Sequence, residues 1–233
     1  TQQSAEGEAW SVSTLLDAAD RARSADCCVV DVTAADTTDL QIAAVDRGFH
    51  LVTANKKPLA GSLASWRQLF ETAAARGAMV GFETTFGAGL PVLHTLREMV
   101  QTGDEIEEIA GCFSGTLGFL ASRLEDGAGL AAAVEEARAL GFTEPDPRED
   151  LSGADVARKA VIVARAMGLA IEPADVDLQP FVLGMDRPLA DALGAYEPVM
   201  ALRVAEAVAR GGVWRYVATI RRDGVRVGLV EVP

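Results

Sequence analysis

The residue types best suited to chemistry lie in one segment, residues 141–159, which reads GFTEPDPREDLSGADVARK. Its first half carries four carboxylates on a stretch that two prolines keep from coiling, namely Glu144, Asp146, Glu149 and Asp150. Carboxylates on a rigid loop can hold a cationic substrate, and an adjacent lysine can move a proton. The segment therefore predicts a site that binds a cationic substrate and moves a proton.

Asp155 and Lys159 follow on a stretch with helical periodicity, 153–167, which Gly168 is expected to end. Residues four apart share a helix face, so the two side chains can meet. Taken alone, the pair has a second interpretation, an exposed ion pair worth roughly 0.2–0.5 kcal/mol. The acidic cluster before it also has alternatives, a solvated loop or a divalent-cation site. Its spacing and the lack of a central glycine argue against an EF-hand.

The first ninety residues alternate between helical and strand-like patterns, which predict the elements that position part of the site. We expect helices over 12–22, from Thr37 or Thr38 to Arg47, and over 65–76, and strands over 29–32, 50–53 and 79–83. The valines of the first strand are typical of burial on both faces. Strands and helices that alternate with short connections favour parallel pairing, so the pattern predicts a doubly wound α/β unit.

After about residue 90 the pattern changes. We expect a strand over 105–113, helices over 117–124, 130–140, 153–167 and 199–209, and strands over 214–220 and 225–232. Asp223-Gly224 between the last two strands indicates a hairpin. The second half is therefore predicted to combine helices with an antiparallel sheet. The fold class is α/β, with a second α+β domain.

Composition narrows the possible functions. The formal net charge of −13 disfavours general nucleic-acid binding, and no apolar run approaches the roughly 20 residues that cross a bilayer. Residues 1–10 lack the pattern of a secretory signal, so a cytoplasmic protein is expected. Cys27, Cys28 and Cys112 are too few for a disulfide framework or a zinc site, and we interpret them as buried free thiols.

One expected motif is absent. Dinucleotide-binding folds open with a strand, a glycine-rich turn and a helix that hold the pyrophosphate. Residues 1–28, which precede the first convincing strand, contain no G-x-G-x-x-G. The first half of the mononucleotide fold is therefore missing from this sequence.

Five stretches carry a family resemblance: VDVT at 30–33, VTANKK at 52–57, GAGLP at 87–91, GCFSGTL at 111–117 and the whole of 141–159. On these, the chain resembles homoserine dehydrogenase, most closely the dehydrogenase region of the bifunctional aspartokinase–homoserine dehydrogenases. The stretches keep their family order and cover nearly the whole chain. The resemblance implies an enzyme that interconverts L-homoserine and L-aspartate 4-semialdehyde with NAD or NADP. It also implies a chain cut at both ends, inactive alone.

The resemblance assigns roles to individual residues. It makes Lys159 the general acid/base with Asp155 as its partner, and it places four residues against the substrate: Glu144, Asp150, Gly115 and Thr116. It places Thr33, Ala34 and Lys56 against the cofactor. Glu83 and the backbone carbonyls of Phe86, Ala88 and Leu90 would hold a monovalent cation, usually sodium. Without the resemblance, some of these positions have a simpler interpretation. Gly115 would be an ordinary turn residue, and Thr33 a helix cap or strand residue. The 83–90 loop would be a glycine-rich turn without an ion.

The resemblance also implies a domain plan. Residues 1–90 would be a partial Rossmann-type dinucleotide-binding domain, and residues 91–233 a substrate-binding and dimerisation domain that forms a homodimer or higher homo-oligomer. Two alternatives remain open: a non-catalytic dimerisation or regulatory remnant without the phosphate loop, and a related reductase that acts on another small semialdehyde. The 144–159 stretch argues against the related reductase. A glycine-rich loop upstream in the parent gene, together with the missing C-terminal stretch, would argue against the remnant.

Overall fold

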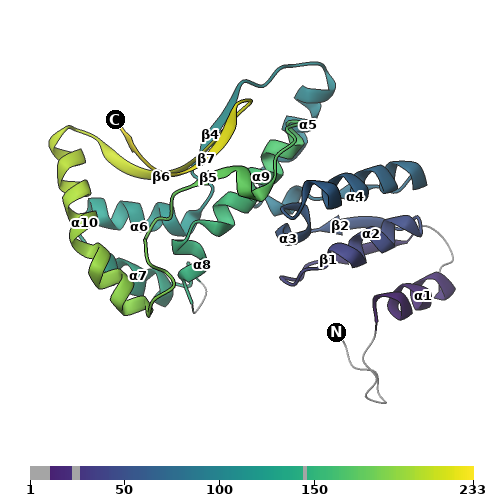
Figure 1. The fold of residues 1–233 in the computed structure, drawn as a ribbon, viewed down its shortest axis with the longest axis horizontal. Helices are drawn as coiled ribbons and strands as arrows, with labels where there is room; N and C mark the ends of the chain where they lie inside the picture. Colours follow the sequence, from purple (N-terminus) through teal and green to yellow (C-terminus); the bar gives the residue numbers. More distant parts are fainter. Residues whose placement is uncertain (1–10, 23–26, 144–145) are drawn as a thin grey trace, which may run out of the picture. The chain divides into compact units, whose positions relative to one another are not determined.

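The computed structural model describes residues 11–22, 27–143 and 146–233 and divides the chain into two compact units (Figure 1). Unit 1 is Thr1–His94 and unit 2 is Thr95–Pro233. Glu144, which the sequence assigns to the substrate, lies outside the described residues.

Unit 1 is built on a parallel sheet with the strand order β1-β2-β3: β1 (Cys28–Asp31), β2 (His50–Thr53) and β3 (Val80–Gly81). The helices along the chain are α1 (Val12–Ala22), α2 (Thr38–Asp46), α3 (Lys56–Leu59) and α4 (Leu63–Arg76). This confirms the predicted α/β unit, in which helices link parallel strands. The carboxyl ends of β1 and β2 open at one edge of the sheet, because the strands run the same way.

Local sequence signals set the bounds of α4. The Ser62 side chain accepts a hydrogen bond from the Ser65 amide at the helix start, and Gly77 ends the helix with a φ of 67°. Within unit 1, Trp66 and Phe70 of this helix pack against Phe82, with ring centroids 5.7 and 5.5 Å from that of Phe82. The aromatic cluster holds α4 against the end of β3.

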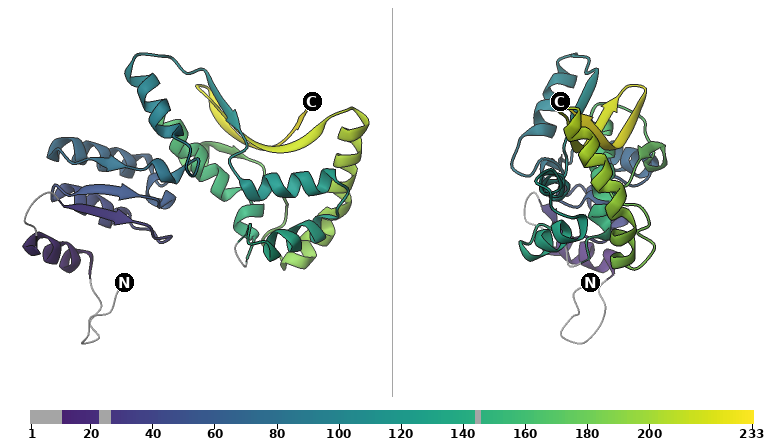
Figure 2. Two further views of the ribbon diagram at one scale, coloured as in Figure 1. Left: turned by 180° about the vertical axis from the view of Figure 1, so that it is seen from behind. Right: turned by 90° about the vertical axis from the view of Figure 1, so that its left-hand side faces the viewer.

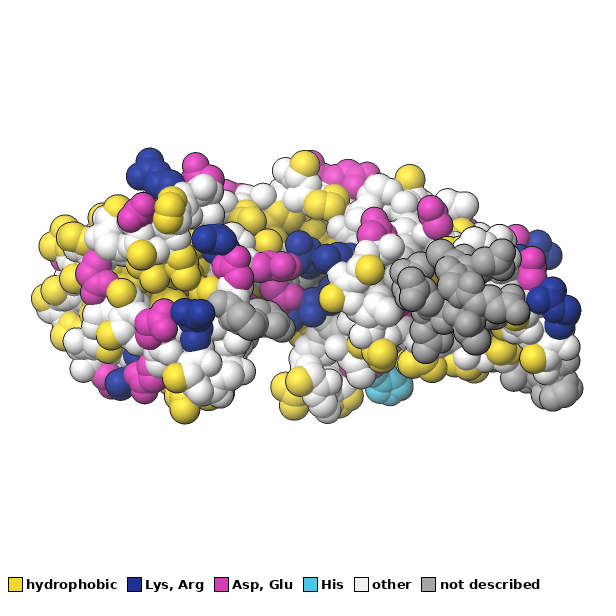
Figure 3. Space-filling view, turned by 90° about the horizontal axis from the view of Figure 1, so that it is seen from below, with side chains coloured by type: hydrophobic (Ala, Val, Ile, Leu, Met, Phe, Trp, Pro, Cys, Tyr) yellow, Lys and Arg dark blue, Asp and Glu magenta, His cyan; other side chains and the backbone are white. Residues whose placement is uncertain are grey.

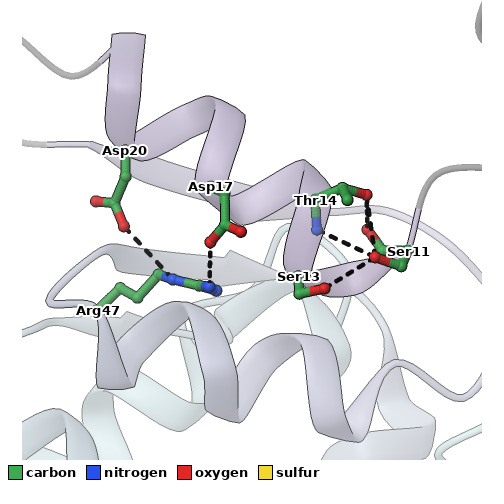
Figure 4. A network of polar contacts seen from close by, with 6 residues as sticks. All are labelled: Ser11, Ser13, Thr14, Asp17, Asp20 and Arg47. Atoms are coloured by element: carbon green, nitrogen blue, oxygen red, sulfur yellow. Dashed lines mark hydrogen bonds and ion pairs between the residues drawn. The ribbon is translucent and has the colours of Figure 1, made fainter.

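A small cluster fixes α1 on α2. Leu16, Ala44 and Phe49 are buried together. At the surface above them, Arg47 forms ion pairs with Asp17 and Asp20 of α1 (Figure 4). Because this pairing is partly exposed, the apolar contact is the larger stabilising contribution.

Unit 2 contains a four-stranded sheet with the order β4-β6-β7-β5: β4 (Glu108–Gly111), β6 (Val213–Arg221), β7 (Gly224–Val232) and β5 (Val176–Leu178). β6 and β7 form the expected antiparallel hairpin, with Arg221 opposite Gly224 at the turn. The predicted antiparallel pairing is confirmed for β4, β6 and β7, whereas β5, which was not predicted, pairs parallel to β7. A strand of three residues gave no periodic signal in the sequence.

The remaining helices are α5 (Val92–Gln101), which crosses the boundary between the units, and, in unit 2, α6 (Gly115–Glu125), α7 (Leu130–Ala139), α8 (Arg148–Leu151), α9 (Ala154–Ala166) and α10 (Leu189–Ala209). α6 and α9 pack on one face of the sheet, as two opposite views show (Figures 1 and 2). On that face Tyr216, Ala218 and Ile220 of β6 are buried. The alternate residues of β6 are half-buried.

Three sequence expectations about unit 1 are wrong. Val30 of β1 and Val32 just after it are 63% and 75% exposed, because the described residues leave one face of the sheet uncovered. Val52 of the central strand β2, which pairs with Val30, is 45% exposed as well. Thr37 stands at the start of α2 without capping it, since its hydroxyl donates to Asp31. The third strand covers only Val80–Gly81, and Glu83 lies in a 3₁₀ turn.

The surface of unit 2 mixes charged and apolar side chains (at the left of Figure 3). Leu140, Phe142 and Leu202 are each more than half exposed. The cysteines are free, as expected, but Cys28 and Cys112 are exposed, so the prediction of buried thiols is wrong for these two. Within the described ranges, no helix combines the length and the apolar character needed to cross a membrane.

Candidate functional site

Lys159 and Asp155 form the centre of the candidate site in unit 2. Lys159 Nζ lies 2.8 Å from Asp155 Oδ2 and donates a 2.8 Å hydrogen bond to the carbonyl oxygen of Phe113. The two side chains are 20% and 25% exposed, so the pair is half-buried. The sequence predicted the pair, and the structure adds the backbone carbonyl as a second acceptor.

The first turn of α9 is fixed by a close contact below it. Gly153 precedes the helix with a φ of 77°, and a Cβ at this position would overlap the Tyr216 hydroxyl oxygen. That hydroxyl donates a 2.7 Å hydrogen bond to the carbonyl of Gln179, and burial raises the pKa of Tyr216. Only glycine therefore lets α9 begin here, with Asp155 in its first turn.

The segment after β4 supplies the carbonyl of Phe113 and then starts α6. The Ser114 hydroxyl caps that helix by accepting from the Leu117 amide at 3.1 Å. Gly115 is exposed at the helix start; its φ is not left-handed, and a Cβ there would meet nothing within 4 Å. The backbone thus does not require glycine at 115, which leaves open space beside Phe113.

Thr116 ties this segment to the acidic one. Its hydroxyl donates a 2.6 Å hydrogen bond to the carbonyl of Phe142, and the Phe142 ring packs on Phe119 with 4.9 Å between centroids. The start of α6 and the chain entering the acidic segment are therefore held together. Asp150 is half-buried in α8.

The predicted cofactor residues share one edge of unit 1. Thr33 and Ala34 follow β1 and are exposed, and Lys56 follows β2 as the first residue of α3. The Thr33 hydroxyl donates to Asp31 at 2.8 Å, so the side chain does not cap a helix. The structure thus brings these three residues to the carboxyl edge of the parallel sheet, where open α/β folds bind ligands.

The predicted cation loop curls tightly between Glu83 and α5. Ala88 has a φ of 51°, and the Leu90 amide donates to the Gly87 carbonyl at 2.9 Å. Glu83 Oε1 accepts the Leu93 amide at 3.0 Å and so caps the start of α5. The described residues contain no group of three or more His, Cys, Asp and Glu that could hold a metal ion. Any cation at this loop would depend largely on backbone carbonyls.

A buried network behind the predicted cofactor residues was not predicted from the sequence. Asp31, at the end of β1, is 3% exposed and accepts hydrogen bonds from Thr33, Thr37, Gln41 and Asn55. Burial raises the pKa of Asp31, but these hydrogen bonds, led by that of Thr37, outweigh it and lower the pKa to about 2. A polar residue that ends an otherwise apolar strand was the available signal.

Two family models match the chain in order. The model described as homoserine dehydrogenase, NAD binding domain, matches residues 3–83, and the model described as homoserine dehydrogenase matches residues 91–233. The chain belongs to the homoserine dehydrogenase family. Its two halves therefore correspond to the family's nucleotide-binding and dehydrogenase parts.

Individual relatives agree with this family. The bifunctional aspartokinase/homoserine dehydrogenase of Haemophilus influenzae is 40% identical over 210 residues, which cover 87% of this chain and 26% of the relative. The homoserine dehydrogenase of Paracoccidioides brasiliensis is 39% identical over 218 residues, 86% of this chain and 58% of the relative. A hyperthermophilic archaeal homoserine dehydrogenase solved in complex with NADPH is similar with a TM-score of 0.70 and 25% identity, over 88% of this chain and 56% of that one. The chain thus spans from about a quarter to somewhat over half of these relatives.

Proposed function

We propose that this chain forms the central part of an enzyme that interconverts L-homoserine and L-aspartate 4-semialdehyde with NAD or NADP. The observation that carries the proposal is the position of Lys159. An ammonium group has three N–H donors, and in the described part of the chain two acceptors face it, Asp155 and the Phe113 carbonyl. The third donor remains available for the oxygen of a substrate.

This arrangement suits proton transfer to or from an oxygen. Oxidising an alcohol removes the hydroxyl proton while a hydride leaves the same carbon, and a bound nicotinamide supplies the acceptor for that hydride. Lys159, as a neutral amine, takes the hydroxyl proton; in the reverse direction its ammonium returns a proton to the aldehyde oxygen. Asp155 and the Phe113 carbonyl hold the nitrogen in one position throughout.

Substrate recognition is assigned to the acidic segment and the start of α6. Homoserine carries an ammonium group, and charge-assisted hydrogen bonds to Glu144 and Asp150 would hold it. Gly115 leaves space at the start of α6, and Thr116 anchors the chain that leads to residue 144. These residues would orient the substrate, whereas Lys159 moves the proton.

The cofactor is assigned to unit 1. Thr33, Ala34 and Lys56 lie at the carboxyl edge of the sheet, and the family model for NAD binding matches this unit. The similar archaeal structure holds NADPH. Residues 1–90 would thus bind the nucleotide, and residues 91–233 would bind the substrate and form the dimer interface.

The direct test is a homoserine oxidation assay on the full-length protein with NAD and NADP in turn. We expect turnover with at least one nucleotide, and reduction of L-aspartate 4-semialdehyde in the reverse direction. Succinate semialdehyde, which lacks the ammonium group, is the matched substrate and should react far more slowly. Equal rates would support a reductase for another semialdehyde, and no turnover would support a non-catalytic remnant.

We further propose that the 83–90 loop holds a sodium ion. The carbonyls of Phe86, Ala88 and Leu90 and the carboxylate of Glu83 offer only oxygen atoms, which suit a hard cation. Glu83 still has acceptor capacity, because only Oε1 is known to bond the Leu93 amide. Activity in sodium chloride should exceed activity in tetramethylammonium chloride at equal ionic strength. Equal activity in both salts would contradict the site.

A homodimer is proposed from the sheet of unit 2. Helices α6 and α9 cover one face, and the other presents partly exposed residues such as Val217, Thr219 and Val230. Pairing of this face with its symmetry mate would bury it, and two-fold dimers are the commonest closed assembly. Sedimentation of the full-length protein should show a dimer at micromolar concentration; a monomer alone would overturn this proposal.

A further inference from the structure

A cluster of polar side chains is buried at the carboxyl edge of the sheet in unit 1. Asp31, Gln41, Thr53 and Asn55 are all at most 3% exposed. Burying a carboxylate is costly unless hydrogen bonds compensate for the lost water. Here they do, and the donors come from three separate parts of the chain.

Both oxygens of Asp31 are fully used. Oδ1 accepts the amide of Thr33 at 2.9 Å and its hydroxyl at 2.8 Å. Oδ2 accepts the Thr37 hydroxyl, Gln41 Nε2 at 2.8 Å and Asn55 Nδ2 at 3.3 Å. In the described part of the chain, all five donor groups are neutral. The charge of Asp31 therefore organises polar groups instead of pairing with a cation.

Asn55 extends the network to the next strand end. Its Nδ2 also donates to the carbonyl of Ala35 at 2.8 Å. Its Oδ1 accepts the Lys57 amide and so caps the start of α3. Lys56 is the first residue of that helix. The network around Asp31 thus reaches both the turn that carries Thr33 and, through Asn55, the start of the helix that carries Lys56.

The same local motif occurs a second time without the network. Asp36 accepts the amide and hydroxyl of Thr38, two residues further on, as Asp31 does from Thr33. Asp36 is exposed, and no Gln or Asn donates to it among the described residues. The difference between the two aspartates is therefore the buried connection to Gln41 and Asn55.

We propose that Asp31 is a positioning residue for the nicotinamide cofactor, which fixes Thr33 and Lys56 relative to one another without touching the cofactor itself. This rests on the proposed function. At 3% exposure the carboxylate is closed off from a ligand, so its effect must pass through the two turns. Its loss should weaken cofactor binding and leave homoserine binding and the proton transfer at Lys159 nearly unchanged.

Asp31→Asn keeps the size of the side chain and tests this directly. In wild type, both oxygens of Asp31 accept hydrogen bonds from donors. Whichever way the new amide turns, its NH₂ group therefore replaces one of these acceptors and faces other donors. Gln41 cannot compensate without a further loss, because exchanging its oxygen and nitrogen would bury the NH₂ group where Oε1 now has no partner. Buried donors left unsatisfied shift the turn, and we expect at least about a tenfold rise in the dissociation constant of the reduced cofactor.

The experiment compares full-length wild type, Asp31→Asn, Thr37→Val and, as the matched control, Asp36→Asn. Cofactor dissociation constants are measured by NADH and NADPH fluorescence, and kcat and the KM of homoserine at saturating cofactor. We expect a large rise in the dissociation constant for Asp31→Asn, a smaller one for Thr37→Val, and less than about a twofold change for Asp36→Asn.

A purely structural role gives a different result. If Asp31 only supports the fold, the variant would lose binding amplitude and kcat in proportion to the fraction that fails to fold. The folded protein would keep the wild-type dissociation constant for the cofactor. That result would overturn the inference. If Asp31→Asn does not fold, Thr37→Val decides in the same way. Wild type that turns over homoserine while both variants bind cofactor normally refutes only this inference. Wild type that binds neither nucleotide refutes the proposed function itself.

Discussion

Lys159 and Asp155 meet at 2.8 Å one turn apart on α9, and the carbonyl of Phe113, in the segment after β4, accepts a 2.8 Å hydrogen bond from the same lysine nitrogen. An exposed ion pair on a helix would not need the second acceptor. Two acceptors from different elements hold the nitrogen against rotation, and the pair is only a fifth to a quarter exposed. The geometry therefore favours a positioned proton-transfer group over a solvated ion pair.

The first prediction concerns Lys159→Ala. Because a proton-transfer group contributes about 10²–10⁴-fold to rate, we expect kcat to fall by that factor while homoserine binding changes little. Arg158→Ala is the control, since Arg158 is the neighbouring cation on the same helix and pairs with Glu149 instead. Steady-state kinetics and thermal melting of both variants decide. Equal loss of stability and activity in Lys159→Ala would make Lys159 structural.

A double-mutant cycle tests whether Asp155 acts through Lys159. If its role is to hold the lysine, Asp155→Ala lowers kcat, but adding it to Lys159→Ala lowers kcat hardly further. The expected departure from additivity is at least about tenfold in kcat. The four kcat values are measured at saturating substrate and cofactor. Additive losses would mean that Asp155 contributes independently of Lys159.

The sequence predicted best where a signal is local. Asp223-Gly224 between alternating strands predicted the β6–β7 hairpin, and Gly168 after an apolar stripe predicted the end of α9. It predicted less well where neighbours decide. α10 begins ten residues before the expected start and continues through Pro198, because tertiary packing of Leu193 and Tyr196 supports its first turns. The valines within 29–32 could not show that one face of the parallel sheet stays uncovered, because that depends on how the other elements pack.

The candidate site divides in the same way. The i, i+4 spacing placed Asp155 beside Lys159 from the sequence, since a helix alone fixes that distance. The Phe113 carbonyl had no sequence signal, because every residue has a carbonyl and only the fold brings this one to the lysine. Asp31 and Asn55 are 24 positions apart, and their contact depends on the parallel pairing of β1 and β2.

Glu144→Gln should separate substrate binding from chemistry. The change keeps the shape and one acceptor but removes the charge that would meet the substrate ammonium. Losing a charge-assisted bond of about 1.5–3 kcal/mol weakens homoserine binding by roughly 10- to 150-fold. Asp146→Asn is the control, since Asp146 pairs with Arg148. Titrations with homoserine and with cofactor measure both effects. Weaker cofactor binding with normal homoserine binding would contradict the assignment.

Gly153→Ala should destabilise the fold strongly. Alanine costs about 1–2 kcal/mol in a left-handed conformation, and here its Cβ would also overlap the Tyr216 hydroxyl and lie 3.1 Å from Leu178. Gly168→Ala at the other end of α9 is the matched control, with a φ of 90° and open space around it. Urea unfolding should show a loss for Gly153→Ala at least about 1 kcal/mol larger. Equal losses of unfolding free energy in the two variants would mean that the Tyr216 side chain moves aside without destabilising the fold.

The last prediction concerns the pH dependence of stability that Asp31 imposes. Its pKa falls from 3.8 to about 2 in the folded state, so folding favours the charged carboxylate. The stabilisation is complete above about pH 4, where the unfolded group is also ionised, and is lost as the pH falls towards 2. A shift of this size corresponds to roughly 2 kcal/mol.

Other carboxylates titrate in the same range, so the quantity to measure is the difference in unfolding free energy between wild type and Asp31→Asn, by urea titration from pH 6 to 2. That difference should shrink by roughly 2 kcal/mol across pH 4 to 2, whereas the difference for the exposed Asp36→Asn should change much less. A difference for Asp31→Asn that stays constant with pH would mean that the carboxylate is not charged within the network.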